Sequence, residues 1–236
     1  KSATQATKLA KTLVAVGKRM GIKIKAILTD MNQPLGFAVG NSVEVLESID
    51  VLSGGGPLDV RILSIELAAH MAVLADICSS IGAARNLAKH ALNDGTALKK
   101  FSDICASQGY IPSGPNLIDS LKSEIPVAEN FVDLRAKKDC YVNKIDGQEL
   151  GIILIELGGG RKTITDKVDP SVGFRLYVKI GTHLKKGDIY MRAYYNVKRL
   201  NEMGLNEVNL VERLNKVIHT SGKQIAPPKL CGQVIQ

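Results

Sequence analysis

The sequence DMNQPLGFAVGN, residues Asp30–Asn41, decides how the first part of this chain folds. It follows a short apolar run and enters a predicted helix, with Asn41 as the N-cap and Glu44 as its partner in a capping box. A strand that ends in a loop containing Gly and Pro, and then enters a capped helix, is a common place for a ligand or an ion. The stretch therefore predicts an α/β unit with a site in this loop.

The segments before the loop predict a helix followed by a buried strand. Residues 3–20 place Leu9, Leu13, Val16 and Met20 at helical spacing, and Gly21 is a suitable stop. Residues 24–31 indicate a strand that becomes apolar on both faces, which favours a covered, largely parallel sheet. We therefore expect the helix and second strand of a βαβ unit whose first strand is missing.

The rest of the chain divides at Pro126, where the predicted pattern changes from mainly helical to mixed. Helices are expected over 41–52, over 59–95 with a break near 79–82, over 96–106 and over 117–123. Beyond the boundary we expect strands over 131–142, 174–180, 189–195 and 229–236, and helices over 148–157 and 207–219. The predicted fold class is α/β over 1–126, part of a mixed or parallel sheet flanked by helices, followed by an α+β domain over 127–236.

Two glycine turns at Gly181 and Gly187 lie six residues apart between apolar strands. This spacing resembles half of a lipoyl- or biotinyl-type β-sandwich. No lysine sits there in an attachment-type turn, so we interpret this barrel-sandwich-like element as architecture and not as a swinging-arm carrier.

Composition limits the classes of partner. The chain has 236 residues, of which 45% are hydrophobic, and no uncharged apolar stretch reaches the roughly 18–20 residues that a membrane span needs, so no membrane association is expected. The formal net charge is +8, and seven basic residues precede the first acid: Lys1, Lys8, Lys11, Lys18, Arg19, Lys23 and Lys25. Without interleaved aromatic residues or a nucleic-acid module, we favour a solvated helix face over nucleic-acid binding. An anion-binding module on the first helix remains an alternative.

The four cysteines are far apart in the sequence and form no Cys-x-x-Cys pair. This spacing argues against structural zinc and favours free thiols in a reducing compartment, which predicts a cytoplasmic protein. They are Cys78, Cys105, Cys140 and Cys231.

Several short motifs occur in order along the chain. They are Leu28–Gly36 (LTDMNQPLG), Val39–Asn41, Leu92–Gly95 (LNDG), Glu156–Arg161 (ELGGGR) and Lys179–Gly181 (KIG). Together they resemble one family, the thymidine and pyrimidine-nucleoside phosphorylases. The similarity covers nearly the whole chain and matches the second half of that family. The resemblance implies a transferase that cleaves the N-glycosidic bond of thymidine or uridine with inorganic phosphate.

The resemblance also shows what this chain lacks. The family's phosphate-binding Lys-His-Ser-Thr-Gly-Gly loop is absent, as are its base-gripping Arg, Ser and Lys, so we assign no catalytic or substrate-binding residue. We therefore expect a C-terminal part of such an enzyme that is inactive alone. Its implied partners are an N-terminal half or partner chain, pyrimidine nucleoside and phosphate in the complete enzyme, and a second copy in a homodimer. Because the first residue is Lys1, we expect a processed product, a trimmed chain or a fragment.

One family site maps onto residues that are present. Bacterial members bind a potassium-type monovalent cation through two backbone carbonyls and a glutamate, and the matching positions are Leu35, Ala38 and Glu47. Carbonyl and carboxylate oxygens suit a hard cation. The alternative is that no cation occupies the site in this chain, that Glu47 is a solvated helix residue and that Leu35 packs. The sequence favours this alternative. No other cofactor is implied.

Other polar motifs are interpreted structurally. The glycines of 158–160 lack the spacing of a phosphate loop and predict a helix C-cap, and His70 on an apolar helix predicts a satisfied core or interface histidine. A competing hypothesis for the whole chain is a truncated, non-catalytic structural or binding remnant of the same fold. A coding segment upstream of Lys1 would favour the enzyme.

Overall fold

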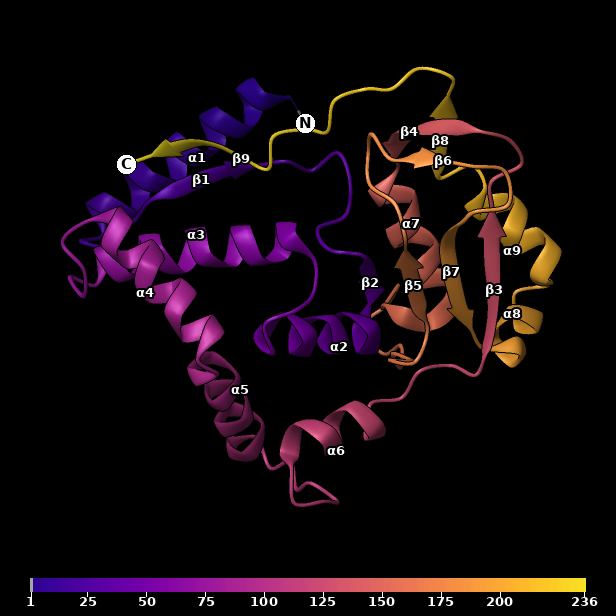
Figure 1. The fold of residues 1–236 in the computed structure, drawn as a ribbon, viewed down its shortest axis with the longest axis horizontal. Coiled ribbons are helices and arrows are strands. Elements are labelled where there is room, and N and C mark those ends of the chain that lie inside the picture. The colour runs from indigo at the N-terminus through magenta and orange to yellow at the C-terminus, as the bar shows by residue number, and fades with distance from the viewer. Residues whose placement is uncertain (1) are drawn as a thin grey trace.

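A computed structural model describes residues 2–236 (Figure 1). The part of the chain up to residue 126 is mostly helical, with two short strands. Its elements are α1 (Ala3–Arg19), β1 (Ala26–Thr29), β2 (Ala38–Gly40), α2 (Asn41–Leu52), α3 (Leu58–Leu74), α4 (Ile81–Asn93), α5 (Thr96–Ser107) and α6 (Leu117–Glu124). The predicted helices are confirmed, including the break near 79–82.

The part of the chain from residue 127 onward mixes strands and helices, as predicted. Its elements are β3 (Asn130–Arg135), β4 (Cys140–Ile145), α7 (Gly147–Leu154), η1 (Ile155–Gly159), β5 (Gly173–Leu176), β6 (His183–Leu184), β7 (Ile189–Tyr195), α8 (Val197–Glu202), α9 (Glu207–Leu214), β8 (Ile218–Ser221) and β9 (Cys231–Ile235). The α/β character with an α+β second part is therefore confirmed. The two glycine turns are also present, with φ of 94° at Gly181 and 93° at Gly187.

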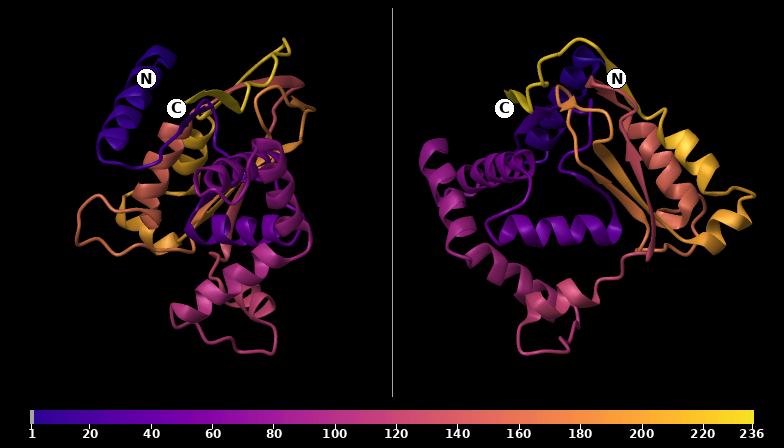
Figure 2. Two further views of the ribbon diagram at one scale, coloured as in Figure 1. Left: turned by 90° about the vertical axis from the view of Figure 1, so that its left-hand side faces the viewer. Right: turned by 45° about the vertical axis from the view of Figure 1, so that its right-hand side comes forward.

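Three small sheets organise the described residues, and every strand pairing among 2–236 is antiparallel. Their orders are β1-β9, β2-β5-β7-β3 and β6-β4-β8. The parallel pairing expected for residues 24–31 is therefore not found within 2–236. The strand β1 is covered instead by α1 and paired with the last strand, because the chain after β8 crosses back to the first part (Figure 2).

The two parts of the chain exchange strands. The strand β2 precedes residue 126 but is the edge strand of the sheet formed by β5, β7 and β3. In return, β9 leaves the second part and pairs with β1, so Ala26 lies opposite Ile235. The boundary at residue 126 therefore stays a prediction, and the loop between β1 and β2 bridges two sheets.

Local capping explains where the helices near this loop begin and end. In α1, Ser2 and Gln5 form a capping box, and Gly21 follows the helix with φ of 73°. The N-cap of α2 is Gly40 and not the predicted Asn41. The Glu44 carboxylate accepts from the Gly40 N–H at 3.0 Å, while the Asn41 amide is turned away and donates to the Gly159 carbonyl at 2.7 Å.

Some elements of the second part differ from the expectation. The predicted strand 131–142 is two strands, β3 and β4, and the predicted helix 207–219 ends at Leu214, with β8 beginning at Ile218. Helix α8 was not predicted. The predicted glycine stop at 158–160 is confirmed: α7 continues into the π-helical turn η1, which ends where Gly158 has φ of 99°. None of the helices within 2–236 is long and apolar enough to span a bilayer.

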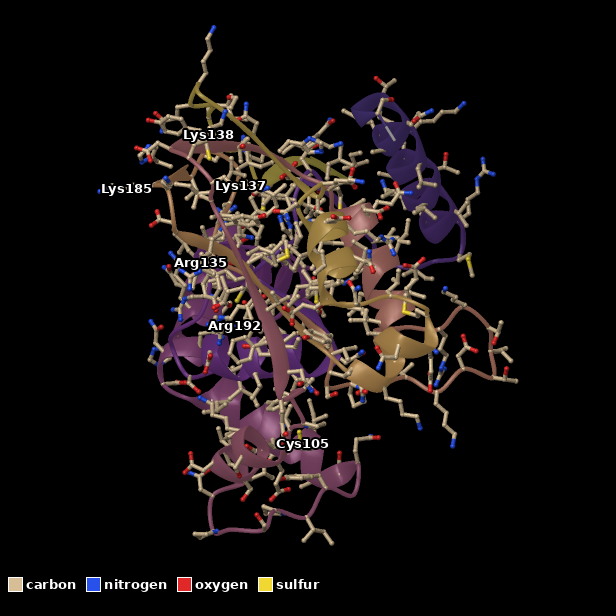
Figure 3. All side chains as sticks on the ribbon, turned by 90° about the vertical axis from the view of Figure 1, so that its right-hand side faces the viewer. Cys105, Arg135, Lys137, Lys138, Lys185 and Arg192 are labelled. Atoms are coloured by element: carbon tan, nitrogen blue, oxygen red, sulfur yellow. The ribbon has the colours of Figure 1, made fainter. Side chains whose placement is uncertain are left out.

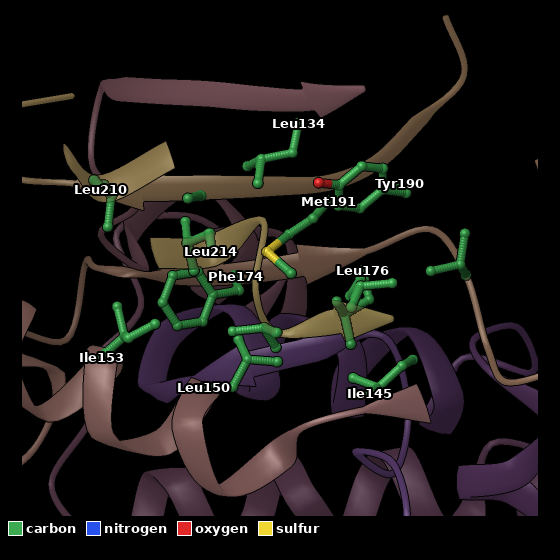
Figure 4. Close-up of a cluster of buried hydrophobic side chains, with 14 of the residues drawn as sticks. Leu134, Ile145, Leu150, Ile153, Phe174, Leu176, Tyr190, Met191, Leu210 and Leu214 are labelled. Atoms are coloured by element: carbon green, nitrogen blue, oxygen red, sulfur yellow. The ribbon is translucent and has the colours of Figure 1, made fainter. Parts of the chain in front are cut away.

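The main core lies in the second part of the chain. Every residue of the larger buried cluster falls between Leu134 and Ile218, and Phe174, Leu150, Met191 and Leu214 meet at its centre (Figure 4). The smaller buried cluster contains Ala10, Val14 and Ile235, where α1 covers β1 and β9.

Candidate functional site

The loop between β1 and β2 is held by one lysine from the second part of the chain. The Lys179 ammonium donates to the Pro34 carbonyl at 2.8 Å, to the Gly36 carbonyl, and to Asp59 Oδ2 at 2.7 Å. A lysine ammonium has three N–H donors, so these three acceptors satisfy it completely. The Lys179 side chain is only 19% exposed, which makes this tie a partly buried one.

Two more contacts fix the same loop to the strand end beyond β5. The Gln33 side chain accepts from the Ile180 N–H at 2.8 Å. The Lys179 ammonium also lies 5.1 Å from the centroid of the Phe37 ring, within the range of a cation–π interaction. The loop is therefore positioned by residues about 145 positions away in the sequence.

Glu47 holds the other side of the loop from α2. Its Oε1 accepts from the Phe37 N–H at 2.9 Å and the Ala38 N–H at 3.0 Å. Burial raises the pKa of the Glu47 carboxyl, while the two N–H groups and the Lys179 charge oppose that shift. Glu47 is thus half-buried and bonded to the loop, in contrast to the alternative of a solvated helix residue.

The geometry requires glycine at position 36. Gly36 has φ of 68°, a left-handed conformation that side chains disfavour. A Cβ there would lie 2.0 Å from Glu47 Oε2, so a larger residue would displace the carboxylate. Backbone conformation and carboxylate position are therefore coupled at this point.

The charges in the site are unequally matched. Lys179 and Asp59 form an ion pair, but within residues 2–236 no cationic side chain lies within 4.0 Å of the Glu47 carboxylate. Glu47 Oε1 is used by the two N–H groups, and Oε2 faces Gly36. The site therefore contains one half-buried carboxylate without a charged partner among the described residues.

A cavity of about 430 Å³ adjoins this loop. Its walls come from the loop, from the start of α3 and from the tail that carries the chain back to β9. Lining residues include Gln33, Pro34, Phe37, Asp59, Lys179 and Pro227. The size falls in the range of small-molecule pockets.

The structure brings together only some of the residues expected from sequence. Glu47 meets the backbone of Ala38, which is buried, whereas Leu35 is 42% exposed and lines the cavity beside the loop. Asp59 and Lys179 were missed as site residues. Lys179 did lie within a motif of the family resemblance, so that motif was the one available signal.

A second polar cluster joins α3, α4 and the start of β9. Arg85 donates to both oxygens of Glu66, at 2.7 and 2.8 Å, and these bonds hold the pKa of Glu66 below its usual range. His70 Nε2 lies 3.2 Å from Glu66, but His70 Nδ1 is buried without a hydrogen-bond partner among the described residues. The prediction of a satisfied histidine is therefore met at one nitrogen only.

This cluster lacks the features of a nucleophilic or metal centre. Burial raises the pKa of the Cys231 thiol, and the Glu66 charge adds to that effect, which disfavours a reactive thiolate. Within residues 2–236, no group of three or more His, Cys, Asp or Glu side chains gathers to hold a metal ion. The cluster is best explained as a partly buried polar contact between α3 and α4.

The known proteins reported next as similar to this chain are all pyrimidine-nucleoside phosphorylases. Residues 141–214 match the family described as the pyrimidine nucleoside phosphorylase C-terminal domain. A pyrimidine-nucleoside phosphorylase of Geobacillus stearothermophilus is 38% identical over 203 residues, which cover 86% of this chain and 46% of that protein. One from Staphylococcus aureus (strain USA300) is 33% identical over 235 residues, 100% of this chain and 52% of that protein.

This chain matches the C-terminal half of the pyrimidine-nucleoside phosphorylase family. The chain spans about half the length of the curated relatives that it matches. A further pyrimidine-nucleoside phosphorylase, from Bacillus subtilis (strain 168), is 36% identical over 203 residues, which cover 86% of this chain and 46% of that protein. The match to the family's C-terminal domain falls on α7, β5, β7 and α9, which carry much of the larger core.

Proposed function

We propose that this chain supplies the C-terminal half of a pyrimidine-nucleoside phosphorylase. The complete enzyme would convert thymidine, or uridine, and phosphate into the free base and the sugar 1-phosphate. The observation that carries this proposal is the similarity to a pyrimidine-nucleoside phosphorylase over 100% of the chain. We infer a non-catalytic share for these residues, because no phosphate loop or base-gripping set occurs in the sequence.

The chemistry explains why this half needs a partner. Phosphorolysis requires donors that hold phosphate and groups that stabilise negative charge on the leaving base. The loop described above offers a carboxylate, backbone carbonyls and one ammonium that is already fully bonded. We therefore assign this loop a structural role. It shapes one wall of the active site, and the N-terminal half supplies the reacting groups.

Two features of the first part support an N-terminal partner that completes the sheet. The sheet formed by β1 and β9 has only two strands, so β1 offers an edge that no strand within 2–236 pairs. Helix α1 also exposes an apolar stripe of Leu9, Leu13, Val16 and Met20, whose side chains are 49 to 70% exposed. Both features fit a surface that another part of the folded enzyme covers.

We also propose the cation site formed by the carbonyls of Leu35 and Ala38 and the carboxylate of Glu47. The donors are all oxygens, which suits a potassium-type ion, and the Glu47 charge has no cationic partner among the described residues. Lys179 is paired with Asp59, which offsets part of its positive charge near the site. A cation there would balance Glu47 and stabilise the loop.

Dimerisation and location are also part of the proposal. We infer that the complete enzyme is a homodimer and works in the cytoplasm. All four cysteines are free, which fits a reducing compartment. The homodimer rests on the family resemblance alone.

The direct test is co-expression with an N-terminal half that carries the phosphate-binding loop. The chain alone should give no thymidine phosphorolysis, and the purified, folded pair should give base and sugar 1-phosphate. If the chain alone turned over thymidine at a rate proportional to its concentration, its proposed non-catalytic role would be contradicted. A folded pair without activity would favour the competing hypothesis of a non-catalytic remnant.

The cation site has a separate test in the chain itself. Thermal unfolding is compared in potassium chloride and in choline chloride at equal ionic strength. We expect potassium to raise the melting temperature of the unmodified chain and to have no such effect on Glu47→Gln. An equal response in both proteins would remove Glu47 from the site.

A further inference from the structure

Two lysine-bearing turns are bonded to each other at the far end of the larger core, away from the loop at residues 30–40. Residues 135–139 (RAKKD) connect β3 to β4, and residues 184–188 (LKKGD) connect β6 to β7. The Ala136 N–H donates to the Asp188 carbonyl at 2.9 Å, and the Gly187 N–H donates to the Ala136 carbonyl at 2.8 Å. The backbone therefore holds the two turns side by side.

Side chains strengthen the same contact. The Arg135 guanidinium donates to the Gly187 carbonyl at 3.1 Å, and the Asp139 carboxylate accepts from the Lys186 N–H at 2.9 Å. The Asp188 carboxylate accepts from the Lys185 N–H at 2.8 Å. Both acidic residues of the turns are thus bonded to backbone N–H groups.

The result is an unbalanced cluster of positive charge. The two turns contain five basic residues and two acidic residues, a net charge of +3. Within residues 2–236, no carboxylate lies within 4.0 Å of the ammonium groups of Lys137, Lys138, Lys185 or Lys186. Figure 3 shows Lys137, Lys138 and Lys185 on one face of the molecule, near Arg135. Gathering like charges costs free energy, and an anion would offset that cost.

A cavity of about 260 Å³ opens beside these turns. Arg135, Lys137 and Lys138 line it, together with Tyr190, Asn215 and Thr220. The Tyr190 hydroxyl donates to Asn215 Oδ1 at 2.6 Å, so its oxygen lone pairs still accept. Thr220 is an exposed residue, and a threonine hydroxyl can donate or accept.

We propose that this cavity binds a small hydroxylated phosphate ester, such as a sugar phosphate. The basic residues suit the phosphate group, and the Tyr190 and Thr220 hydroxyls suit hydroxyl groups of the sugar. The cavity is too small for a macromolecular groove, and no exposed aromatic ring lines it for base stacking, so a sugar phosphate is favoured over nucleic acid. This inference does not depend on the proposed phosphorolysis, because none of these residues lies in the loop site.

The experiment titrates the full chain with ribose 5-phosphate by calorimetry at low salt, with free ribose and inorganic phosphate as reference probes. We expect ribose 5-phosphate to bind more tightly than phosphate, free ribose not to bind, and affinity to fall as salt rises. If inorganic phosphate bound as tightly as ribose 5-phosphate, the proposed contacts between the cavity and the sugar would be wrong. Binding of a single-stranded oligonucleotide without binding of ribose 5-phosphate would overturn the proposal.

Variants with equal charge changes locate the site. Lys137→Ala/Lys138→Ala should weaken ribose 5-phosphate binding about tenfold, because two charge contacts from the cavity lining are lost. The control Lys8→Ala/Lys11→Ala changes two exposed lysines on α1 and should leave the affinity unchanged. Circular dichroism melting checks that both variants fold. Equal weakening in the two variants would show a diffuse charge effect and contradict the proposed site.

Discussion

The two parts of this chain differ in how completely they bury their apolar side chains. Residues from Leu134 to Ile218 form one continuous core with Phe174, Leu150 and Met191 fully buried. The first part has one small cluster, and most of the chain's exposed large apolar side chains lie there, including Leu13 and Met71. An apolar surface of this kind normally faces another part of a folded protein. The comparison therefore contrasts a well-packed second part with a first part whose exposed apolar surface fits the proposed N-terminal partner.

The two parts are joined by polar bonds, by exchanged strands and by the packing of Phe37 and Val39 against the larger core. The Lys179 tie, the Gln33 contact and the exchanged strands β2 and β9 connect them. Such contacts fix geometry, but they bury less apolar surface than the second core does. The loop at residues 30–40 is thus positioned by the well-packed part, although its sequence belongs to the first part.

The largest effect should come from truncating the second core. Phe174→Ala removes a fully buried side chain and should lower the free energy of unfolding by ~3–5 kcal/mol. The matched change in the first part, Leu13→Ala, affects a side chain that is 54% exposed and should cost less than ~1 kcal/mol. Urea unfolding monitored by circular dichroism measures both. Similar losses in the two variants would remove the contrast between the parts.

A smaller effect should come from cutting the tie between the parts. Lys179→Met leaves Asp59 and two loop carbonyls without their donor and should cost ~1–3 kcal/mol. The control Lys23→Met breaks an ion pair whose side chains are 63% and 77% exposed, and should change stability by less than ~1 kcal/mol. Urea unfolding again measures both. If the two variants lost equal stability, the Lys179 contacts would contribute no more to stability than an exposed ion pair does.

The smallest effect concerns acid. The pKa of Glu66 is lowered by Arg85, so its contribution to stability is present above the usual glutamate value of 4.5 and is lost as pH falls through the lowered value. The pKa of Glu47 is raised by burial, so stability from this group falls as pH rises from 4.5 through the raised value. Melting temperatures are measured from neutral pH to about pH 3.

Two variants separate these opposite contributions. Glu66→Gln should lower the melting temperature most at neutral pH, and the difference from the unmodified chain should shrink in acid. For Glu47→Gln the trend should be reversed: the melting temperature of the unmodified chain should rise relative to that of the variant as pH falls. The same pH trend in both variants would contradict the two environments described for these carboxylates.

Sequence predicted the local structure well wherever the signal was local. Helix α1 was expected over 3–20 and is Ala3–Arg19, because apolar spacing and the stop at Gly21 are short-range features. Helix α5 was expected over 96–106 and is Thr96–Ser107. The antiparallel pairing of β1 with β9 was not predicted, because this partner comes from the end of the chain and no local pattern specifies it.

The candidate site shows the same limit. Glu47 was selected through a family resemblance, but its bonds to the N–H groups of Phe37 and Ala38 depend on the turn at Gly36. Asp59 and Lys179 meet across 120 positions of sequence, so neither spacing nor periodicity could pair them. Long-range polar contacts of this kind arise from the packing of whole elements, which the residues report only indirectly.

The central claim, that the first part is incomplete without further chain, is tested most directly by hydrogen exchange. Exchange is followed by mass spectrometry in the chain alone and in the folded pair with an N-terminal half. We predict slow exchange for the strands between Leu134 and Tyr195 in both samples, and slower exchange in β1 and α3 only when the partner is present. Equal protection of both parts in the chain alone, unchanged by the partner, would contradict it.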